Sequence, residues 1–284
     1  MNNLNNGKRI DIRLIALDLD GTLLNSDKQL SPRNRTALFQ AAQKGILIVP
    51  TTGRLPGALS PAVRSLPFLR YVIAVNGAII SDVLTGEVLR RQEISNHDAL
   101  RILDVLQKYD GIYDCYVDGC GYMNAEMLAK AEHYTEDSHQ LKLVRDTRRP
   151  VADLKSFLLD RGCSVQKSQI MFSCRKDRDR ALSELRVLLP DFLHTCTYST
   201  NIEINSPAAN KGAALSFLCD HLNIPIECTM SFGDGSNDIT MLKAAGIGVV
   251  MGNAEPDILP YGDITAPTCD EDGVADIIER YVLK

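Results

Sequence analysis

Short apolar runs alternate with longer segments of helical periodicity at both ends of the 284-residue chain. The runs are rich in Ile, Val and Leu and lack the polar alternation of a half-exposed strand, so they predict buried strands. Between the first two runs, residues 31–45 predict a helix, because Ser31 suits the N-cap, Pro32 the first helical position and Gly45 the stop. The three runs that open the chain lie at residues 13–19, 46–53 and 71–80.

The same alternation returns after residue 205. Helices are predicted over residues 210–222, 237–246 and 270–283, and strands over residues 227–234, 247–253 and 263–267. Strands that alternate with helices predict an α/β fold, with helices on both faces of a parallel sheet and right-handed crossovers. The expected core is therefore a doubly wound parallel sheet that both ends of the chain build together.

The middle of the chain follows a different pattern. Amphipathic helices are predicted over residues 96–109 and 176–189, with short strands at residues 112–118, 169–174 and 201–205. We interpret this stretch as a second α/β module inserted into the first. The predicted domains are a core from residues 1–84 and 206–284 and an insert from residues 85–205, with hinges near residues 84–86 and 205–207.

Composition narrows the choice of partners. A net charge of −5 argues against nucleic acid or an anionic membrane as the main partner, whereas a small anionic substrate needs only a few local cations or a metal. No apolar run of the sequence is long enough to span a bilayer. The Asn-rich residues 1–9 predict a loose tail without the apolar stretch of a signal peptide, and the eight cysteines form no CxxC pair. A reduced, cytoplasmic protein is expected.

Polar residues gather where the predicted strands end. The first strand ends at Asp18 and Asp20, the second at residues 51–54, the third at residues 76–77 and the returning strand at residues 233–234. In a parallel α/β sheet, ligands bind outside the carboxyl ends of the strands. These polar residues are therefore expected to share one site.

The carboxylates of this site predict a metal. Asp18 and Asp20 are two residues apart, so in an extended chain they face the same way, roughly 6–7 Å apart. If both are ionised and buried they repel each other, and a divalent cation removes that conflict. Asp234 and Asp238 add two more carboxylates, and such an oxygen ligand set suits Mg²⁺. The alternative is structural: Asp20 stabilises the turn with Gly21, and Asp238 favours a helix N-terminus.

A set of motifs makes the chain recognisable. DLDGTLL, TTGR, NKGAAL and GDGSND occur in the order typical of the haloacid dehalogenase superfamily, which the chain resembles. NGAII, MGNA and DEDGV narrow the resemblance to the Cof-like branch, whose members are mostly Mg²⁺-dependent phosphatases. The resemblance covers residues 12–83 and 205–280. It departs at Cys269, where the family usually has an asparagine.

The resemblance implies a role for each residue of the site. Asp18 corresponds to the nucleophile that forms an aspartyl-phosphate, and Asp20 to the general acid–base, a role that needs a raised pKa. For the cations, structural alternatives stay open, with Lys211 as a solvated residue at a helix start and Arg54 as a surface or salt-bridge residue. The implied phosphate contacts are Leu19, Thr52, Gly53, Lys211 and Asn237. The implied Mg²⁺ ligands are Asp18, Asp20 (through its carbonyl), Asp234 and Asp238.

The insert corresponds to the family's cap, which closes over the active site, excludes water and contacts the leaving group. A candidate contact loop is residues 116–127, which contain Tyr116, Asp118, Tyr122 and Asn124. The alternative for this loop is an ordinary hairpin with packed tyrosines.

The predicted function is a Mg²⁺-dependent phosphatase that hydrolyses a small phosphorylated metabolite, such as a sugar phosphate or a phosphorylated cofactor. One alternative is a phosphomutase, which would share Asp18 and Asp20 but retain its phosphorylated intermediate. The other is a non-enzymatic phosphoaspartate switch, in which Asp20 would be superfluous as an acid.

Overall fold

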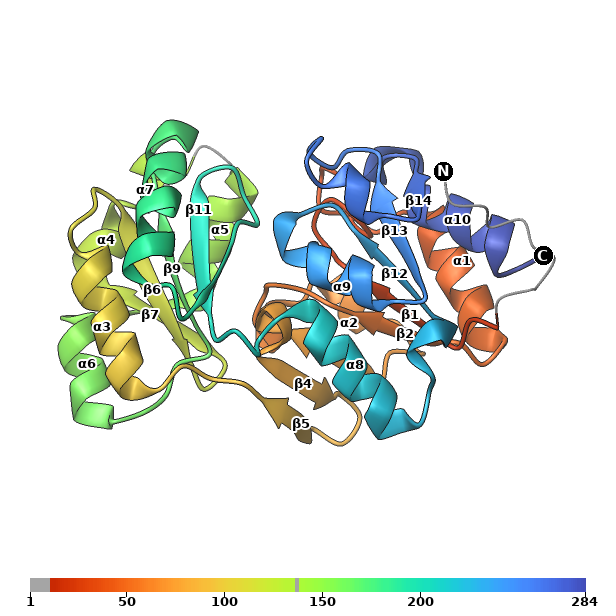
Figure 1. Cartoon of the computed structure of the whole chain (residues 1–284), viewed down its shortest axis with the longest axis horizontal. Helices are drawn as coiled ribbons and strands as arrows, with labels where there is room; N and C mark the ends of the chain where they lie inside the picture. The colour runs from red at the N-terminus through yellow and green to blue at the C-terminus, as the bar shows by residue number, and fades with distance from the viewer. Residues whose placement is uncertain (1–10, 136–137) are drawn as a thin grey trace.

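The computed structural model describes residues 11–135 and 138–284, and Figure 1 shows them as two units side by side. One unit contains both ends of the described chain, and we call it the terminal unit. The middle of the chain builds the other, the inserted unit. The tail predicted at residues 1–9 lies outside the described residues.

The terminal unit is built on a parallel sheet of five strands in the order β14-β13-β12-β1-β2. Helices α1 and α10 cover one face of this sheet, and α8 and α9 cover the other (Figure 1). The prediction of a doubly wound parallel sheet is therefore confirmed. The strands are β1 (Leu14–Leu17), β2 (Leu47–Pro50), β12 (Thr229–Gly233), β13 (Ile247–Met251) and β14 (Ile264–Ala266). The helices are α1 (Pro32–Gln43), α2 (Pro61–Arg64), α8 (Lys211–Leu222), α9 (Ile239–Ala244) and α10 (Gly273–Tyr281).

Strand β1 lies at the centre of this core, with both faces covered. Ile15 and Leu17 belong to the apolar cluster that includes α1 and α10, whereas Leu14 and Ala16 belong to the cluster that includes α8 and α9. Successive side chains of a strand point to opposite faces of its sheet. All positions of β1 are therefore buried and apolar, which is why its sequence shows no polar alternation.

The prediction of a single strand over residues 71–80 is wrong. They form β3 (Tyr71–Ala74) and the start of β4 (Ile79–Asp82), which is antiparallel to β3 and to β5 (Val88–Arg91). The chain reverses because Val75, Asn76 and Gly77 have φ values of +51°, +56° and +97°, which are incompatible with a continuing strand. Strand β3 meets the parallel sheet at an isolated bridge between Thr51 and Ile73.

A hinge is predicted near residues 84–86. These residues form the turn between β4 and β5, in which Asp82 Oδ1 accepts hydrogen bonds from the N–H groups of Leu84 and Thr85 at 2.9 and 3.2 Å. Because β5 stays paired with β4, the chain crosses into the inserted unit after Arg91. It returns after Asn205, the last residue of β11.

The inserted unit is built on a sheet of six strands in the order β10-β11-β9-β6-β7-β8. The strands are β6 (Ile112–Val117), β7 (Cys120–Asn124), β8 (Arg148–Val151), β9 (Lys167–Met171), β10 (Leu193–Thr195) and β11 (Asn201–Asn205). The helices are α3 (Asn96–Leu106), α4 (Ala125–Ala129), α5 (Ser138–Thr147), α6 (Leu154–Arg161) and α7 (Arg175–Leu188). In neither unit do the described residues form a helix with the length and apolar character needed to cross a membrane.

The two faces of the inserted sheet differ in chemistry. One face packs against α3, α6 and α7 through apolar residues such as Cys115, Val117 and Ile170. Many of the alternate positions of the same strands are buried and polar, and several of these residues line a cavity with Asp18 and Asp20 of the terminal unit. We call this side the polar sheet face, and its residues include Asp114, Tyr116, Lys167, Gln169 and Glu203.

Candidate active site

The loop after β1 brings Asp18 to the carboxyl end of the parallel sheet. Asp18 N–H donates to the carbonyl of Phe232 at 3.0 Å, which continues the β1–β12 ladder, and its side chain is nearly buried. The loop then passes close to Asp234, because a Cβ on Gly21 (φ +82°) would lie 2.3 Å from Asp234 Oδ2. Thr22 Oγ1 donates to Asp234 Oδ1 at 2.8 Å. The glycine and threonine of this motif therefore pack the loop onto Asp234.

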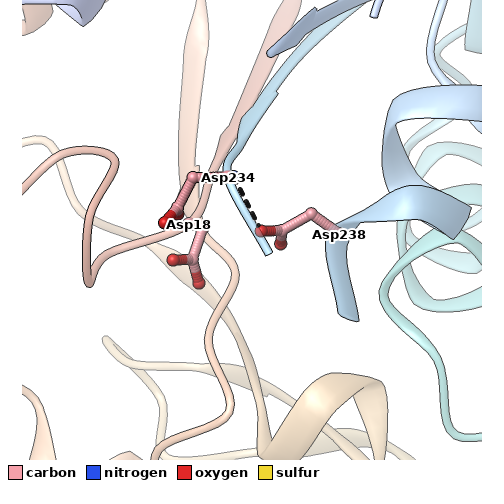
Figure 2. A group of neighbouring side chains, drawn as sticks. All are labelled: Asp18, Asp234 and Asp238. Carbon is pink, nitrogen blue, oxygen red and sulfur yellow. Dashed lines mark hydrogen bonds between the residues drawn. The ribbon is translucent and has the colours of Figure 1, made fainter. Parts of the chain in front are cut away.

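Three carboxylates meet at this edge of the sheet (Figure 2). Asp18, Asp234 and Asp238 each offer an oxygen, and these oxygens lie within 4.8 Å of one another. Asp238 is held in place because its Oδ2 accepts hydrogen bonds from the N–H groups of Asp234 and Gly235 at 3.0 and 2.9 Å. The structure thus assembles the predicted carboxylates from the ends of β1 and β12, except for the side chain of Asp20.

Lys211 places a cation between two of these carboxylates. It is the first residue of α8 and is completely buried, and its Nζ donates to Asp18 Oδ1 at 2.6 Å and to Asp238 Oδ1 at 2.5 Å. Burial alone would lower the pKa of Lys211, but the two carboxylates outweigh it and raise the pKa. The alternative of a solvated lysine is therefore wrong.

The triad carries more negative charge than Lys211 balances. Burial raises the pKa of Asp18 well above its ordinary value, and Asp238 and Asp234 raise it further although Lys211 opposes them. Burial, with the charge of Asp238, also raises the pKa of Asp234 to about 7. An oxygen-only ligand set with surplus negative charge fits a divalent cation such as Mg²⁺.

Asp20 pairs with two cations and is not a member of the triad. Arg54 donates to it from Nε and Nη2, at 2.7 and 2.6 Å, and Lys28 Nζ lies 3.3 Å from its Oδ1. Burial would raise the pKa of Asp20, but Arg54 and Lys28 outweigh it and lower the pKa. This shift of the pKa is opposite to the one that a general acid needs, because two cations hold the carboxyl ionised. Of the alternatives for Arg54, the salt bridge is the one observed, and its partner is Asp20.

The predicted phosphate contacts lie around the triad. Thr52 and Gly53 line one cavity together with Asp18 and Asp20, and Thr52 Oγ1 accepts a hydrogen bond from Arg54 N–H at 3.1 Å. Asn237 lines a neighbouring cleft together with Asp234. The Leu19 side chain packs in the apolar core, so only its backbone is available to a ligand.

Comparison with known proteins identifies the family. Residues 15–278 match the model of a family described as haloacid dehalogenase-like hydrolase. The chain belongs to this family. The hydrolase is 34% identical to phosphatase YwpJ of Bacillus subtilis, over 95% of this chain and 99% of that protein. It is 31% identical to 5-amino-6-(5-phospho-D-ribitylamino)uracil phosphatase YcsE of the same organism, over 96% of this chain and 97% of that one.

Solved structures agree with this assignment. A haloacid dehalogenase-like hydrolase from B. subtilis has a TM-score of 0.83 to this chain at 31% identity, and the match covers 95% of this chain and all of that one. The resemblance read from the motifs is therefore confirmed, and so is the α/β fold that it implies.

The loop of the hydrolase that follows Asp18 is supported despite the departure at Cys269. Asn253, from the MGNA motif, donates from Nδ2 to the carbonyl of Gly21 and accepts a hydrogen bond at Oδ1 from Cys269 N–H, both at 2.8 Å. Residue 269 contributes its backbone to this support, while its side chain is buried in the core.

The inserted unit of the hydrolase contributes a wall that the sequence prediction largely missed. A small cavity separates Asp18 and Asp20 from the polar sheet face. The period-2 alternation of polar residues along β9 and β11 was the available signal, but it does not say which face lies over the site. The wall includes Tyr116, Arg148, Lys167, Gln169, Tyr198 and Glu203.

The candidate contact loop at residues 116–127 is mainly a hairpin. Asp118 and Gly119 form the turn between β6 and β7, and both have positive φ. Tyr122 packs against Phe157 with ring centroids 4.4 Å apart, and Asn124 Oδ1 accepts a hydrogen bond from a backbone N–H of α6. The hairpin alternative is therefore correct, although Tyr116 does line the cavity.

The raised pKa of Asp234 gives a testable pH dependence. Without metal, the unfolded chain loses this proton near the ordinary aspartate pKa of 3.8, whereas the folded hydrolase keeps it to about pH 7. The folded state then binds more protons between these values, so its stability falls as pH rises, by up to about 4 kcal/mol. Urea unfolding in EDTA at pH 4.5 and 7.5 should show this loss in the wild type and a smaller one in Asp234→Asn. Equal losses in the two proteins would contradict the assignment.

Proposed function

We propose that the chain is a Mg²⁺-dependent phosphatase that hydrolyses a small phosphorylated metabolite through an aspartyl-phosphate on Asp18. The observation that carries this proposal is the position of Asp18. Its carboxylate lies in the acidic triad, accepts a hydrogen bond from the buried Lys211 and faces the cavity below the polar sheet face. A carboxylate so placed is a competent nucleophile for phosphoryl transfer.

In the first step an oxygen of Asp18 attacks phosphorus, and the bond from phosphorus to the leaving oxygen breaks. Asp18, Asp234, Asp238 and the carbonyl of Asp20 would hold Mg²⁺, which supplies positive charge against the repulsion between carboxylate and phosphate. Lys211 fixes the orientation of the nucleophile. The hydroxyl of Thr52 and the backbone of Gly53 would bind the phosphate oxygens, with Asn237 alongside.

Asp20 serves both steps in different protonation states. It gives a proton to the leaving alcohol in the first step, so it must begin protonated, and this requires the release of its ion pair with Arg54. In the second step the carboxylate takes a proton from the water that attacks the aspartyl-phosphate, which restores Asp18 and the protonated Asp20. The ionised, paired Asp20 of this structure corresponds to the base form.

The leaving group is proposed to be a sugar or a cofactor fragment. Most residues that line the cavity have polar side chains, which suits a hydroxylated group, and the relative YcsE is named for a phosphorylated ribitylamino-uracil. We also propose that residues 85–205 act as a cap and residues 1–84 and 206–284 as the catalytic core. In this division β5 is the part of the cap segment that remains paired with core strand β4.

A panel of phosphorylated metabolites tests the proposal. We expect free phosphate from at least one of them with Mg²⁺, and a fall to background when EDTA replaces the metal. Asp27→Asn, an exposed substitution close to the active-site loop, should leave the activity unchanged. Phosphate exchanged between positions of a bisphosphate-primed sugar would indicate a phosphomutase instead. A stable acyl-phosphate without turnover would indicate a switch.

A further inference from the structure

A buried ion pair on the polar sheet face contacts the terminal unit at two points. Lys167 of β9 and Glu203 of β11 are 1% and 3% exposed, and Lys167 Nζ lies 2.5 Å from Glu203 Oε1. Lys167 Nζ also donates to the carbonyl of Gly53 at 3.0 Å. Glu203 Oε2 accepts a hydrogen bond from Asn76 Nδ2 at 2.6 Å. Both of these further bonds join the inserted unit to the terminal unit.

The residues contacted in the terminal unit belong to the phosphate-binding segments. Asn76 N–H donates to the carbonyl of Thr52 at 3.0 Å, and Asn76 Oδ1 accepts a hydrogen bond from Asn237 Nδ2 at 3.1 Å. A single asparagine therefore joins Glu203 to two of the residues proposed to bind phosphate, while Lys167 holds the third, Gly53, directly.

This arrangement leaves little freedom around the phosphate loop. A Cβ on Gly53 would lie 2.9 Å from Asn76 Oδ1, so the loop and the asparagine are in close contact. Asn76 itself is held at φ +56° and is almost fully buried. Asparagine tolerates this left-handed conformation better than most residues do. A displacement of Asn76 must therefore also displace Gly53.

The ion pair gives these contacts their strength. Burial raises the pKa of Glu203, but Lys167 and the hydrogen bonds outweigh it and lower the pKa, so the carboxylate stays ionised. Hydrogen bonds to buried charges are stronger than those between neutral groups, and a buried ion pair needs them to offset its lost hydration. Gly53 and Asn76 supply these bonds only while the two units touch.

We propose that Glu203, Lys167 and Asn76 form a relay through which the inserted unit positions the phosphate-binding residues Thr52, Gly53 and Asn237. The inference rests on the proposed function and deepens it. All three are positioning residues, because they act on bound phosphate through other groups. Phosphoryl transfer is sensitive to such placement, since an error of about 1 Å can reduce the rate by about 100-fold.

Two variants break the relay without changing a phosphate contact. Asn76→Gly removes the side chain that links Glu203 to Asn237, and glycine accepts the positive φ of this position. Glu203→Gln keeps an acceptor for Asn76 but removes the charge that pairs with Lys167. Inorganic phosphate is the probe, because it has no leaving group and so does not depend on the rest of the cavity wall.

Asp114→Asn is the matched control. Asp114 is also fully buried on the polar sheet face and accepts hydrogen bonds from Arg148 Nε at 2.9 Å and Gln169 Nε2 at 2.8 Å. Among the described residues, Asp114 and Arg148 make their hydrogen bonds within the inserted unit. The control therefore damages a comparable buried pair that makes no hydrogen bond to Glu203, Lys167 or Asn76.

We expect Asn76→Gly and Glu203→Gln to weaken the binding of inorganic phosphate, measured by calorimetry with Mg²⁺, by about 10-fold. On the best substrate of the panel, kcat should fall by about 10- to 100-fold with a smaller change in KM. Asp114→Asn should stay within about 2-fold of the wild type in phosphate affinity, even if its melting temperature falls equally.

Other results overturn the relay or the function separately. Wild-type phosphate affinity in both relay variants, or an equal loss in Asp114→Asn, overturns the relay. A wild type that binds phosphate but hydrolyses nothing on the panel overturns the phosphatase, while the binding data still decide on the relay. A wild type that binds no phosphate with Mg²⁺ overturns both.

Discussion

Asp18→Asn is expected to lower kcat by at least about 10⁴-fold, with Mg²⁺ and phosphate still bound. The substitution keeps the shape of the side chain and an acceptor for Lys211, but an amide does not attack phosphorus as a carboxylate does. Uncatalysed hydrolysis of phosphate monoesters is extremely slow, and a route without the covalent intermediate must forgo most of the acceleration. The variant should therefore be inactive without being unfolded.

The decisive measurement is the amount of phosphoenzyme after rapid quenching. With p-nitrophenyl phosphate, whose leaving group needs no proton, Asp20→Asn should form the aspartyl-phosphate in a burst and release phosphate slowly. Asp18→Asn should show neither burst nor turnover, and Asp27→Asn should behave as the wild type. A phosphoenzyme formed by Asp18→Asn, or its kcat within about 10-fold of the wild type, would rule out Asp18 as the nucleophile.

The parallel core of the fold could be predicted because each of its elements carries a local signal. Strand β1 is buried on both faces and therefore apolar throughout, and α1 begins at a serine cap followed by proline. The sequence did not show that residues 71–80 form two strands, β3 and the start of β4, in place of one. The apolar residues of this stretch suit β3 and β4 equally well, and the reversal depends on the left-handed conformation of Val75 and Asn76 as well as on Gly77.

The candidate site also contains some features that local sequence signals predict and others that they do not. Asp18, Asp234 and Lys211 follow from motifs that lie at strand ends or at a helix start, and the structure brings them together. The state of Asp20 does not follow, because it is decided by Arg54 and Lys28, whose positions depend on how separate loops pack. The position of the polar sheet face over the site could not be predicted either. It depends on how the two units pack against each other, and local sequence patterns do not show this.

Lys211→Met is expected to destabilise the metal-free protein by about 3–5 kcal/mol at neutral pH. The substitution keeps most of the side-chain volume but leaves the three carboxylates of the triad without the ammonium that two of them contact. Urea unfolding in EDTA measures the loss, and kcat should fall together with the orientation of Asp18. Lys176→Met is the control, because Lys176 lies exposed in the first turn of α7.

The pH and metal dependence of this loss identify its cause. Removing the cation raises the pKa values of Asp18 and Asp234 in the folded state further above their unfolded values. The loss should therefore be largest near pH 7 and shrink as pH falls, because the carboxyls of the folded state become protonated and their repulsion disappears. Mg²⁺ binds the folded triad and not the unfolded chain, so it should restore part of the stability. A loss that is the same at pH 4.5 and 7.5 and insensitive to Mg²⁺ would mean that Lys211 acts through packing and not through its charge.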